Sequence, residues 1–144
     1  QLRGNCAPTA RKGRAMMGTA KSVLKYLLAF FFVAAGINHF WHPDFYLKMM
    51  PPYLPWPAAL HLLAGLCEIV LGVLLLIPRW QQLAAWGMIA LLIAVYPANI
   101  YMALNPHLFS GMNPTALWIR LPFQFLFIAW AWWFTRDRVS STKH

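Results

Sequence analysis

Four long apolar segments alternate with short polar or proline-rich segments along the chain. They run from Ser22 to His39, from Ala58 to Ile77, from Gln82 to Leu104 and from Thr115 to Phe134. Each is close to the roughly 20 residues that cross a bilayer core of roughly 30 Å. Backbone groups in lipid must find partners within their own segment, so each segment is predicted to be helical. The pattern predicts an all-α fold, an integral membrane four-helix bundle.

The composition agrees with a chain that is solvated by lipid. Only 10% of the 144 residues are charged, whereas soluble domains carry about 25%. The net charge of +9 does not form a basic stripe interleaved with aromatic side chains, so nucleic-acid binding is not expected. The lipid bilayer is the expected surrounding of the chain, and other membrane proteins are its expected partners.

The basic residues predict how the bundle is oriented. They gather before the first helix, in the short turn at Arg79 that joins the second and third helices, and after the last helix. The positive-inside rule then places both termini in the cytoplasm. The bacterial inner membrane is the expected location. An organellar membrane is the alternative, because the basic, acid-free start of the chain also resembles a transit segment.

The two ends of the chain are predicted to lie outside the bundle. Residues 1–21 are expected to be a basic, disordered tail, residues 22–134 the transmembrane domain, and residues 135–144 a cytoplasmic tail. Cys6 and Cys67 are far apart in the sequence and form no CxxC pair, so thiol–disulfide exchange within the chain is not expected.

Polar residues inside the apolar segments are the strongest functional signal. Glu68 is the only acid within any of them, and at a rise of 1.5 Å per residue it lies about 15 Å deep. A charge at that depth costs at least about 2.5–3.5 kcal/mol, which makes it a candidate functional residue. His61 shares a helix face with Glu68, and Arg120 shares one with Gln124.

These polar residues all fall in the half of the bundle opposite the termini. We therefore predict a polar pocket there, covered by the aromatic and proline-rich stretch NHFWHPDFYLKMMPPYLPWP at residues 38–57. The candidate pocket residues are Glu68, Arg120, His61, Asn99, Gln124 and His39, and the candidate outer cap comprises His42, Pro43, Asp44, Tyr46, Pro51 and Pro55.

Each pocket residue also has a purely structural interpretation. Glu68 and Arg120 could form a buried pair that only fixes the register of the helices. His61 could be an ordinary buried histidine, and Asn99 could bond backbone groups freed by Pro97.

The histidines do not predict a metal site. His39 and His42 have an H-x-x-H spacing that approaches that of metal ligands, but Pro43 follows at once and no third ligand is evident. No haem pair is selected by the spacing of the histidines either.

Four pieces of the sequence resemble the DoxX-like family of small four-helix membrane proteins. They are AGINHFWHPDFYLKMMPPYLP, GLCEIVLGVLLLIPR, AVYPANIYMAL and WIRLPFQFLFIAW, in this order, and the resemblance covers residues 22–134. The family pattern falls on His39, Pro43, Pro51, Pro55, Gly65, Glu68, Pro97, Asn99, Arg120 and Gln124.

The resemblance implies two functions. The family is named for a membrane subunit associated with a thiosulfate:quinone oxidoreductase, which favours an accessory subunit of a quinone-linked redox complex. A quinone would be the bound molecule, and its carbonyl oxygens would accept from Arg, Asn or His. The chain has no flavin, nicotinamide or iron–sulfur motif, so it would not be a complete enzyme alone. Distant relatives act as assembly chaperones or cargo receptors, so a membrane scaffold or assembly factor is the alternative.

Overall fold

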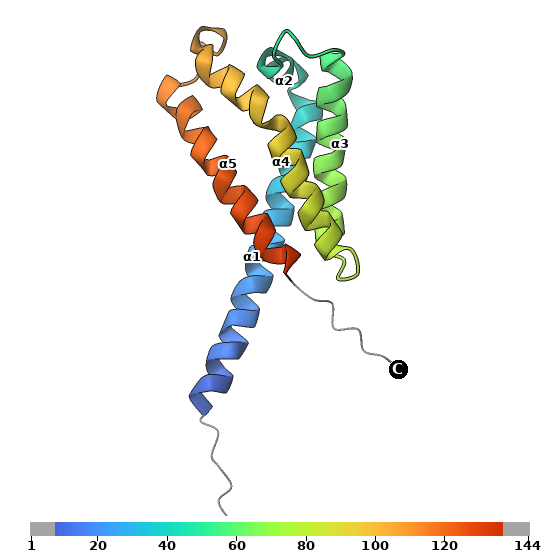
Figure 1. The fold of residues 1–144 in the computed structure, drawn as a ribbon, viewed down its shortest axis with the longest axis vertical. Coiled ribbons are helices and arrows are strands. Elements are labelled where there is room, and N and C mark those ends of the chain that lie inside the picture. The colour runs from blue at the N-terminus through green and yellow to red at the C-terminus, as the bar shows by residue number, and fades with distance from the viewer. Residues whose placement is uncertain (1–7, 137–144) are drawn as a thin grey trace, which may run out of the picture.

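The computed structural model describes residues 8–136, and all regular secondary structure among them is helical (Figure 1). This confirms the predicted all-α class for that part of the chain. Four of the helices are long and apolar enough to cross a membrane, and they correspond to the four predicted segments. The elements are α1 (Pro8–Trp41), α2 (Pro43–Met49), α3 (Pro57–Leu75), α4 (Gln81–Leu104), the short 3-10 helix η1 (Pro106–Leu108) and α5 (Pro114–Thr135).

The first helix begins much earlier than the sequence pattern indicated. Residues 8–21 were expected to be disordered, but they form the first turns of α1. Residues 11–21 are mostly Arg, Lys, Ala and Met, which are strong helix formers. They therefore continue the helix without needing an apolar face. The remaining parts of the predicted tails, residues 1–7 and 137–144, lie outside the described residues.

The predicted outer cap contains a helix that the apolar pattern did not reveal. Pro43 is the first residue of α2 and Asp44 lies in its first turn. Proline suits the first position of a helix, and an acid suits its N-terminal turn. The seven residues of α2 are too few to show a periodic apolar stripe, so composition alone indicated a loop.

The long helices form two antiparallel pairs. α1 packs mainly against α3, α5 packs mainly against α4, and α3 contacts α4, whereas α1 and α5 touch each other only sparsely. In Figure 1, α5 crosses α1 near the lower end of the bundle and diverges from it toward the upper end, where α2 lies. The described ends of the chain both lie at the lower end.

Glycines allow α1 and α3 to approach closely. A Cβ atom on Gly65 would lie 2.6 Å from His39 Cβ, and one on Gly72 would lie 2.7 Å from a Val33 methyl group. On the facing side, a Cβ on Gly36 would lie 2.6 Å from an Ile69 side-chain carbon. Small residues at such a crossing are typical of helix pairs in membranes. The crossing also holds His39 directly against α3.

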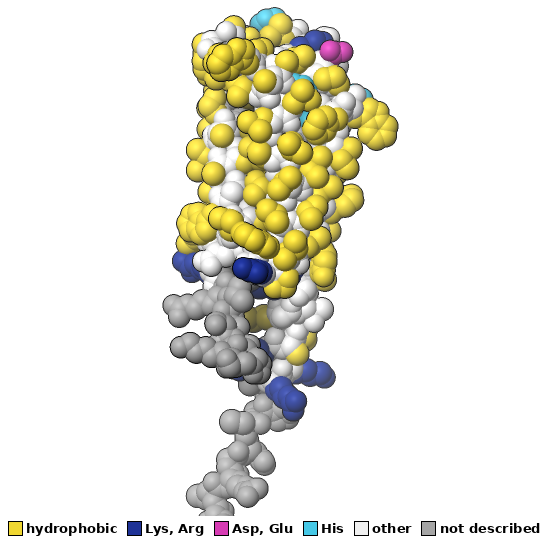
Figure 2. Space-filling model, turned by 90° about the vertical axis from the view of Figure 1, so that its right-hand side faces the viewer, with side chains coloured by type: hydrophobic (Ala, Val, Ile, Leu, Met, Phe, Trp, Pro, Cys, Tyr) yellow, Lys and Arg dark blue, Asp and Glu magenta, His cyan; other side chains and the backbone are white. Residues whose placement is uncertain are grey.

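The bundle has an apolar outer surface and two buried apolar clusters. Apolar side chains cover the long face in Figure 2, while Lys and Arg gather toward its lower end. Inside, one buried apolar cluster includes Leu28, Leu75 and Phe134, and a second includes Met102 and Leu117 near α2 and the loop before α5. The candidate site lies between these two clusters.

Candidate functional site

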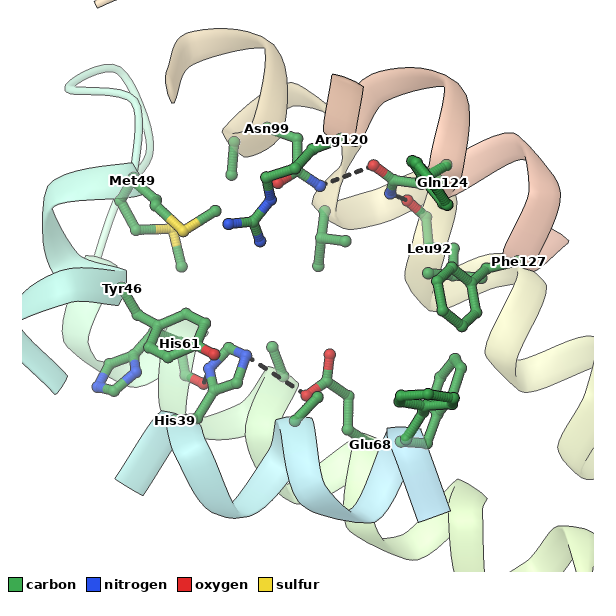
Figure 3. Close-up of a pocket in the computed structure, with 18 residues that line it drawn as sticks. His39, Tyr46, Met49, His61, Glu68, Leu92, Asn99, Arg120, Gln124 and Phe127 are labelled. Carbon is green, nitrogen blue, oxygen red and sulfur yellow. Dashed lines mark hydrogen bonds and ion pairs between the residues drawn. The ribbon is translucent and has the colours of Figure 1, made fainter. Parts of the chain in front are cut away.

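The six predicted pocket residues line one cavity of about 330 Å³ (Figure 3). Tyr46 and Met49 from α2 cover it, and Phe31, Leu92 and Phe127 belong to its apolar wall. All five α-helices contribute to the lining. The segregation of polar residues seen in the sequence therefore corresponds to a shared space rather than to separate buried contacts.

His39 is held by two contacts with α3. Its Nδ1 lies 2.9 Å from the carbonyl oxygen of His61, and its Nε2 lies 3.4 Å from Oε2 of Glu68. A carbonyl oxygen only accepts, so the Nδ1 atom must donate its hydrogen there. Nε2 is then left to face the carboxyl group, with a hydrogen only if the ring is protonated.

A hydrogen bond across the His39–Glu68 contact would require one proton. If the imidazole is neutral, the carboxyl must be protonated to donate to Nε2; if the carboxylate is ionised, the imidazolium must donate. In both arrangements the pair is electrically neutral as a whole. The distance of 3.4 Å is long for a hydrogen bond, and Glu68 Oε2 has no hydrogen-bond partner among the described residues. The two side chains are thus adjacent without a short hydrogen bond between them.

The structural alternative, a buried Glu68–Arg120 pair, is not formed. Among residues 8–136, the ion-pair partner of Glu68 is His39. Arg120 lies on the opposite wall of the cavity in Figure 3, because α5 diverges from α1 and α3 at this level. The sequence placed both residues in the same half of the bundle, but position along a helix does not report the separation between helices.

Arg120 has no protein partner within the described part of the chain. Its side chain is exposed, it lines the cavity, and it makes no hydrogen bond or ion pair with any of those residues. The guanidinium carries five N–H donors. It is therefore available to an acceptor oxygen or an anionic group inside the cavity.

Three nearly parallel rings, those of Tyr46, His39 and His61, gather on the side of the cavity under α2. The Tyr46 ring lies on His39 with a centroid distance of 3.7 Å, and the His61 ring is nearly parallel to that of His39 at 5.9 Å. The Tyr46 hydroxyl accepts a hydrogen bond of 2.8 Å from Asn38 Nδ2. Burial raises the pKa of Tyr46 above its usual value of 10.0, so the phenol is neutral. His61 Nδ1 is buried without a partner among the described residues.

Asn99 and Gln124 form a short chain of hydrogen bonds between α4 and α5. Asn99 Nδ2 donates to Gln124 Oε1 at 2.7 Å, and Gln124 Nε2 donates to the carbonyl oxygen of Leu92. The alternative interpretation gave Asn99 a backbone carbonyl near Pro97 as its partner. Gln124 bonds the carbonyl oxygen of Leu92, five residues before Pro97, while Asn99 Oδ1 is buried without a hydrogen-bond partner among residues 8–136.

The predicted cap residues separate into two groups. Tyr46 lines the cavity and Pro51 is buried close by in the chain, so both belong to the cover. The remaining four are exposed and do not line the cavity: His42, Pro43, Asp44 and Pro55. Met49 and Met50 were missed as lining residues. Met49 follows Tyr46 by three positions, a spacing that places both on one face of a helix.

Comparisons with known proteins give a family but no activity. Residues 28–135 match a family model described as a domain of unknown function (DUF8561). No curated protein matches the chain, and no solved structure matches it either.

Proposed function

The chain belongs to the DUF8561 family, and we propose that it is the membrane-embedded accessory subunit of a quinone-linked redox complex. In this proposal the four long helices span the membrane and both termini lie in the cytoplasm, as the basic residues indicate. The bacterial inner membrane is the proposed location. The resemblance of residues 22–134 to the DoxX-like family supports the redox association, which remains a proposal.

The observation that carries this proposal is the opposition of two kinds of group across one cavity. On one wall, Arg120 offers donors that no described residue uses. On the other wall, the His39–Glu68 pair brings together an imidazole nitrogen and a carboxyl oxygen that can exchange a proton. Reduction of a quinone to a quinol adds two electrons and two protons, and both carbonyl oxygens become hydroxyls. A donor that polarises one oxygen and an acid–base pair that can relay two protons in turn from water to the quinone suit that chemistry.

The chain would supply binding and proton transfer, and not the electrons. None of its sequence motifs indicates a flavin, a nicotinamide or an iron–sulfur cluster. The electrons would come from a partner protein in the same complex. This is why the proposal is an accessory subunit rather than a complete oxidoreductase.

Co-purification tests the proposal directly. The protein is extracted with its native lipid, and bound quinone is measured by extraction and chromatography in wild type, Glu68→Gln and Arg120→Gln. Asp44→Asn is the matched control, because this acid is exposed and lies outside the cavity. Wild type and Asp44→Asn should carry quinone, and both cavity variants should lose most of it while remaining folded. Absence of quinone from wild type, or its retention in both cavity variants, would contradict the proposal.

An assembly factor or scaffold is the second candidate, and exposed aromatic side chains near α2 favour it. Trp41, Tyr53 and Trp56 are 76%, 72% and 78% exposed. Aromatic residues are enriched in protein interfaces, although they also lie at membrane surfaces. If the same preparation yields a partner protein but no quinone, and if Trp56→Ala releases that partner, the scaffold role replaces the redox role.

A further inference from the structure

The residues that line the cavity differ in how far they are exposed. Three of them are exposed: Phe31 on α1, and Arg120 and Phe123 on α5. Every other lining residue, on all five helices, is buried or only partly exposed. A side chain that lines a cavity and is also exposed stands at its opening. The opening therefore lies between α1 and α5, the pair of long neighbouring helices that touch least.

The lower edge of this opening is a contact between aromatic rings. Phe31 meets Phe127 edge to face at a centroid distance of 6.1 Å, and it meets Trp130 at 6.4 Å. These rings join α1 to α5 on the side of the chain termini. Beyond them, toward α2, the two helices diverge (Figure 1).

A small residue keeps the opening free at the next turn. Ala35 follows Phe31 by four positions, about 6 Å along α1, and it lines the cavity. On the antiparallel α5, Phe123 precedes Phe127 by the same four positions. Where Phe31 meets Phe127, two rings close the gap; at the level of Ala35, α1 offers only a methyl group.

The surroundings of the opening are apolar on both helices. Phe30 on α1 is 66% exposed, and Ile119 and Leu126 on α5 are 47% and 58% exposed. In a chain whose long helices span a membrane, such a surface faces the lipid chains. The opening thus leads into the bilayer and not into water.

We infer that the cavity is entered sideways from the bilayer, between α1 and α5, by a prenylated quinone whose head group enters while its chain stays in lipid. This inference rests on the proposed function for the identity of the ligand. A volume of about 330 Å³ is at the small end for ligand pockets, so it holds a head group but no long chain. Arg120 stands at the opening, where its guanidinium meets the head group, and the His39–Glu68 pair lies at the far wall (Figure 3).

Two measurements on the protein in lipid nanodiscs test this route. The first uses a phosphatidylcholine with a photoactivatable diazirine in its acyl chain and maps adducts on the Glu68 side chain by mass spectrometry. The second measures the affinity for a benzoquinone that carries a ten-carbon chain. Both are made on wild type, Ala35→Trp, the milder Ala35→Leu, and Leu66→Trp. Leu66 is 52% exposed, does not line the cavity and lies on α3, which does not border the opening, so it is the matched control.

The inference predicts a graded block at position 35. Wild type and Leu66→Trp should show the Glu68 adduct and bind the tailed quinone alike. Ala35→Trp should lose the adduct and weaken quinone binding about tenfold or more, a difference of about 1.4 kcal/mol, and Ala35→Leu should fall between.

The two arms separate the route from the proposed function. If wild type binds the quinone but shows no Glu68 adduct, or if both substitutions at Ala35 leave both readouts unchanged, lateral entry is wrong and quinone binding stands. If the adduct forms and is blocked at Ala35, but wild type binds no quinone, the lateral route stands and the proposed function fails.

Discussion

His39 and Glu68 face each other across 3.4 Å, with the imidazole oriented by the carbonyl oxygen of His61 on its other side. The orientation is set by backbone geometry, because the 2.9 Å contact from Nδ1 fixes which nitrogen points to the carboxyl group. A histidine whose tautomer is fixed in this way is poised to exchange a proton at the remaining nitrogen. The arrangement depends on the close crossing of α1 and α3, because His39 lies on α1 and Glu68 on α3.

A double-mutant cycle tests whether this contact is an energetic pair. His39→Phe removes both nitrogens but keeps a ring beneath Tyr46, and Glu68→Gln removes the ionisable group while keeping its shape. The free energies of unfolding in detergent should be non-additive by about 0.5–3 kcal/mol, as for residues that share a contact.

The control cycle combines Glu68→Gln with His42→Phe. His42 is exposed and does not line the cavity, so its effect should add to that of Glu68→Gln within about 0.3–0.5 kcal/mol. Equal coupling in both cycles would mean that His39 and Glu68 are not a specific pair.

The α1–α3 crossing makes a second prediction. Gly65→Ala would place a Cβ 2.6 Å from His39 Cβ and 3.1 Å from the carbonyl oxygen of Gly36. Backbone on the facing helix cannot yield as a flexible side chain does, so the helices must separate. Overpacking of this kind costs about 1–3 kcal/mol. Thermal or denaturant unfolding in detergent measures this loss.

Gly111→Ala is the control for the crossing, because a Cβ there would meet nothing within 4 Å. Its stability should match that of wild type. If Gly65→Ala is no less stable than Gly111→Ala, the glycine contact does not set the distance between α1 and α3.

Residue counting located the polar side chains along the bundle but not their lateral neighbours. Counting residues along each helix placed Glu68, Asn99 and Arg120 in the same half of the bundle, and the cavity contains all three. The same counting left a Glu68–Arg120 pair open, because it carries no information on the angle between helices. The partner that Glu68 has, His39, depends on the α1–α3 crossing at Gly65.

Local signals failed where a segment was short or lacked an apolar stripe. The cap helix α2 has only seven residues, and residues 8–21 of α1 carry several basic side chains without an apolar face. In both segments helix propensity and capping decided the structure, whereas the prediction relied on hydropathy. Tyr46 was correctly placed in the cap, but its stacking on His39 could not be read without the fold of α2.

Tyr46 makes the pH dependence of stability predictable. Burial, the largest cause, raises the pKa of Tyr46 above its usual 10.0. The unfolded chain therefore loses this proton first as the pH rises. The resulting contribution to stability is fully present below pH 10.0 and is lost as the pH rises through the folded pKa.

Comparing wild type with Tyr46→Phe isolates this contribution. The variant keeps the ring on His39 but lacks the hydroxyl, so the difference in unfolding free energy should shrink or reverse between about pH 8 and about pH 11. Tyr53→Phe is the control, because Tyr53 is 72% exposed. A constant difference between wild type and Tyr46→Phe over this range would contradict the burial of the phenol.

The orientation of the bundle is tested by cysteine labelling in intact cells or sealed vesicles. Single cysteines are introduced at Tyr53 and Ser110, in the loops after α2 and before α5, and at Arg79, in the turn between α3 and α4. All three positions are exposed, and Cys6 and Cys67 are first replaced by serine and alanine. A membrane-impermeant maleimide should label Tyr53→Cys and Ser110→Cys from outside. It should label Arg79→Cys only after permeabilisation, because basic residues remain on the cytoplasmic side.

The reverse pattern would invert the bundle and place the cavity toward the cytoplasm. Labelling of all three from one side would show that α3 and α4 do not cross the membrane.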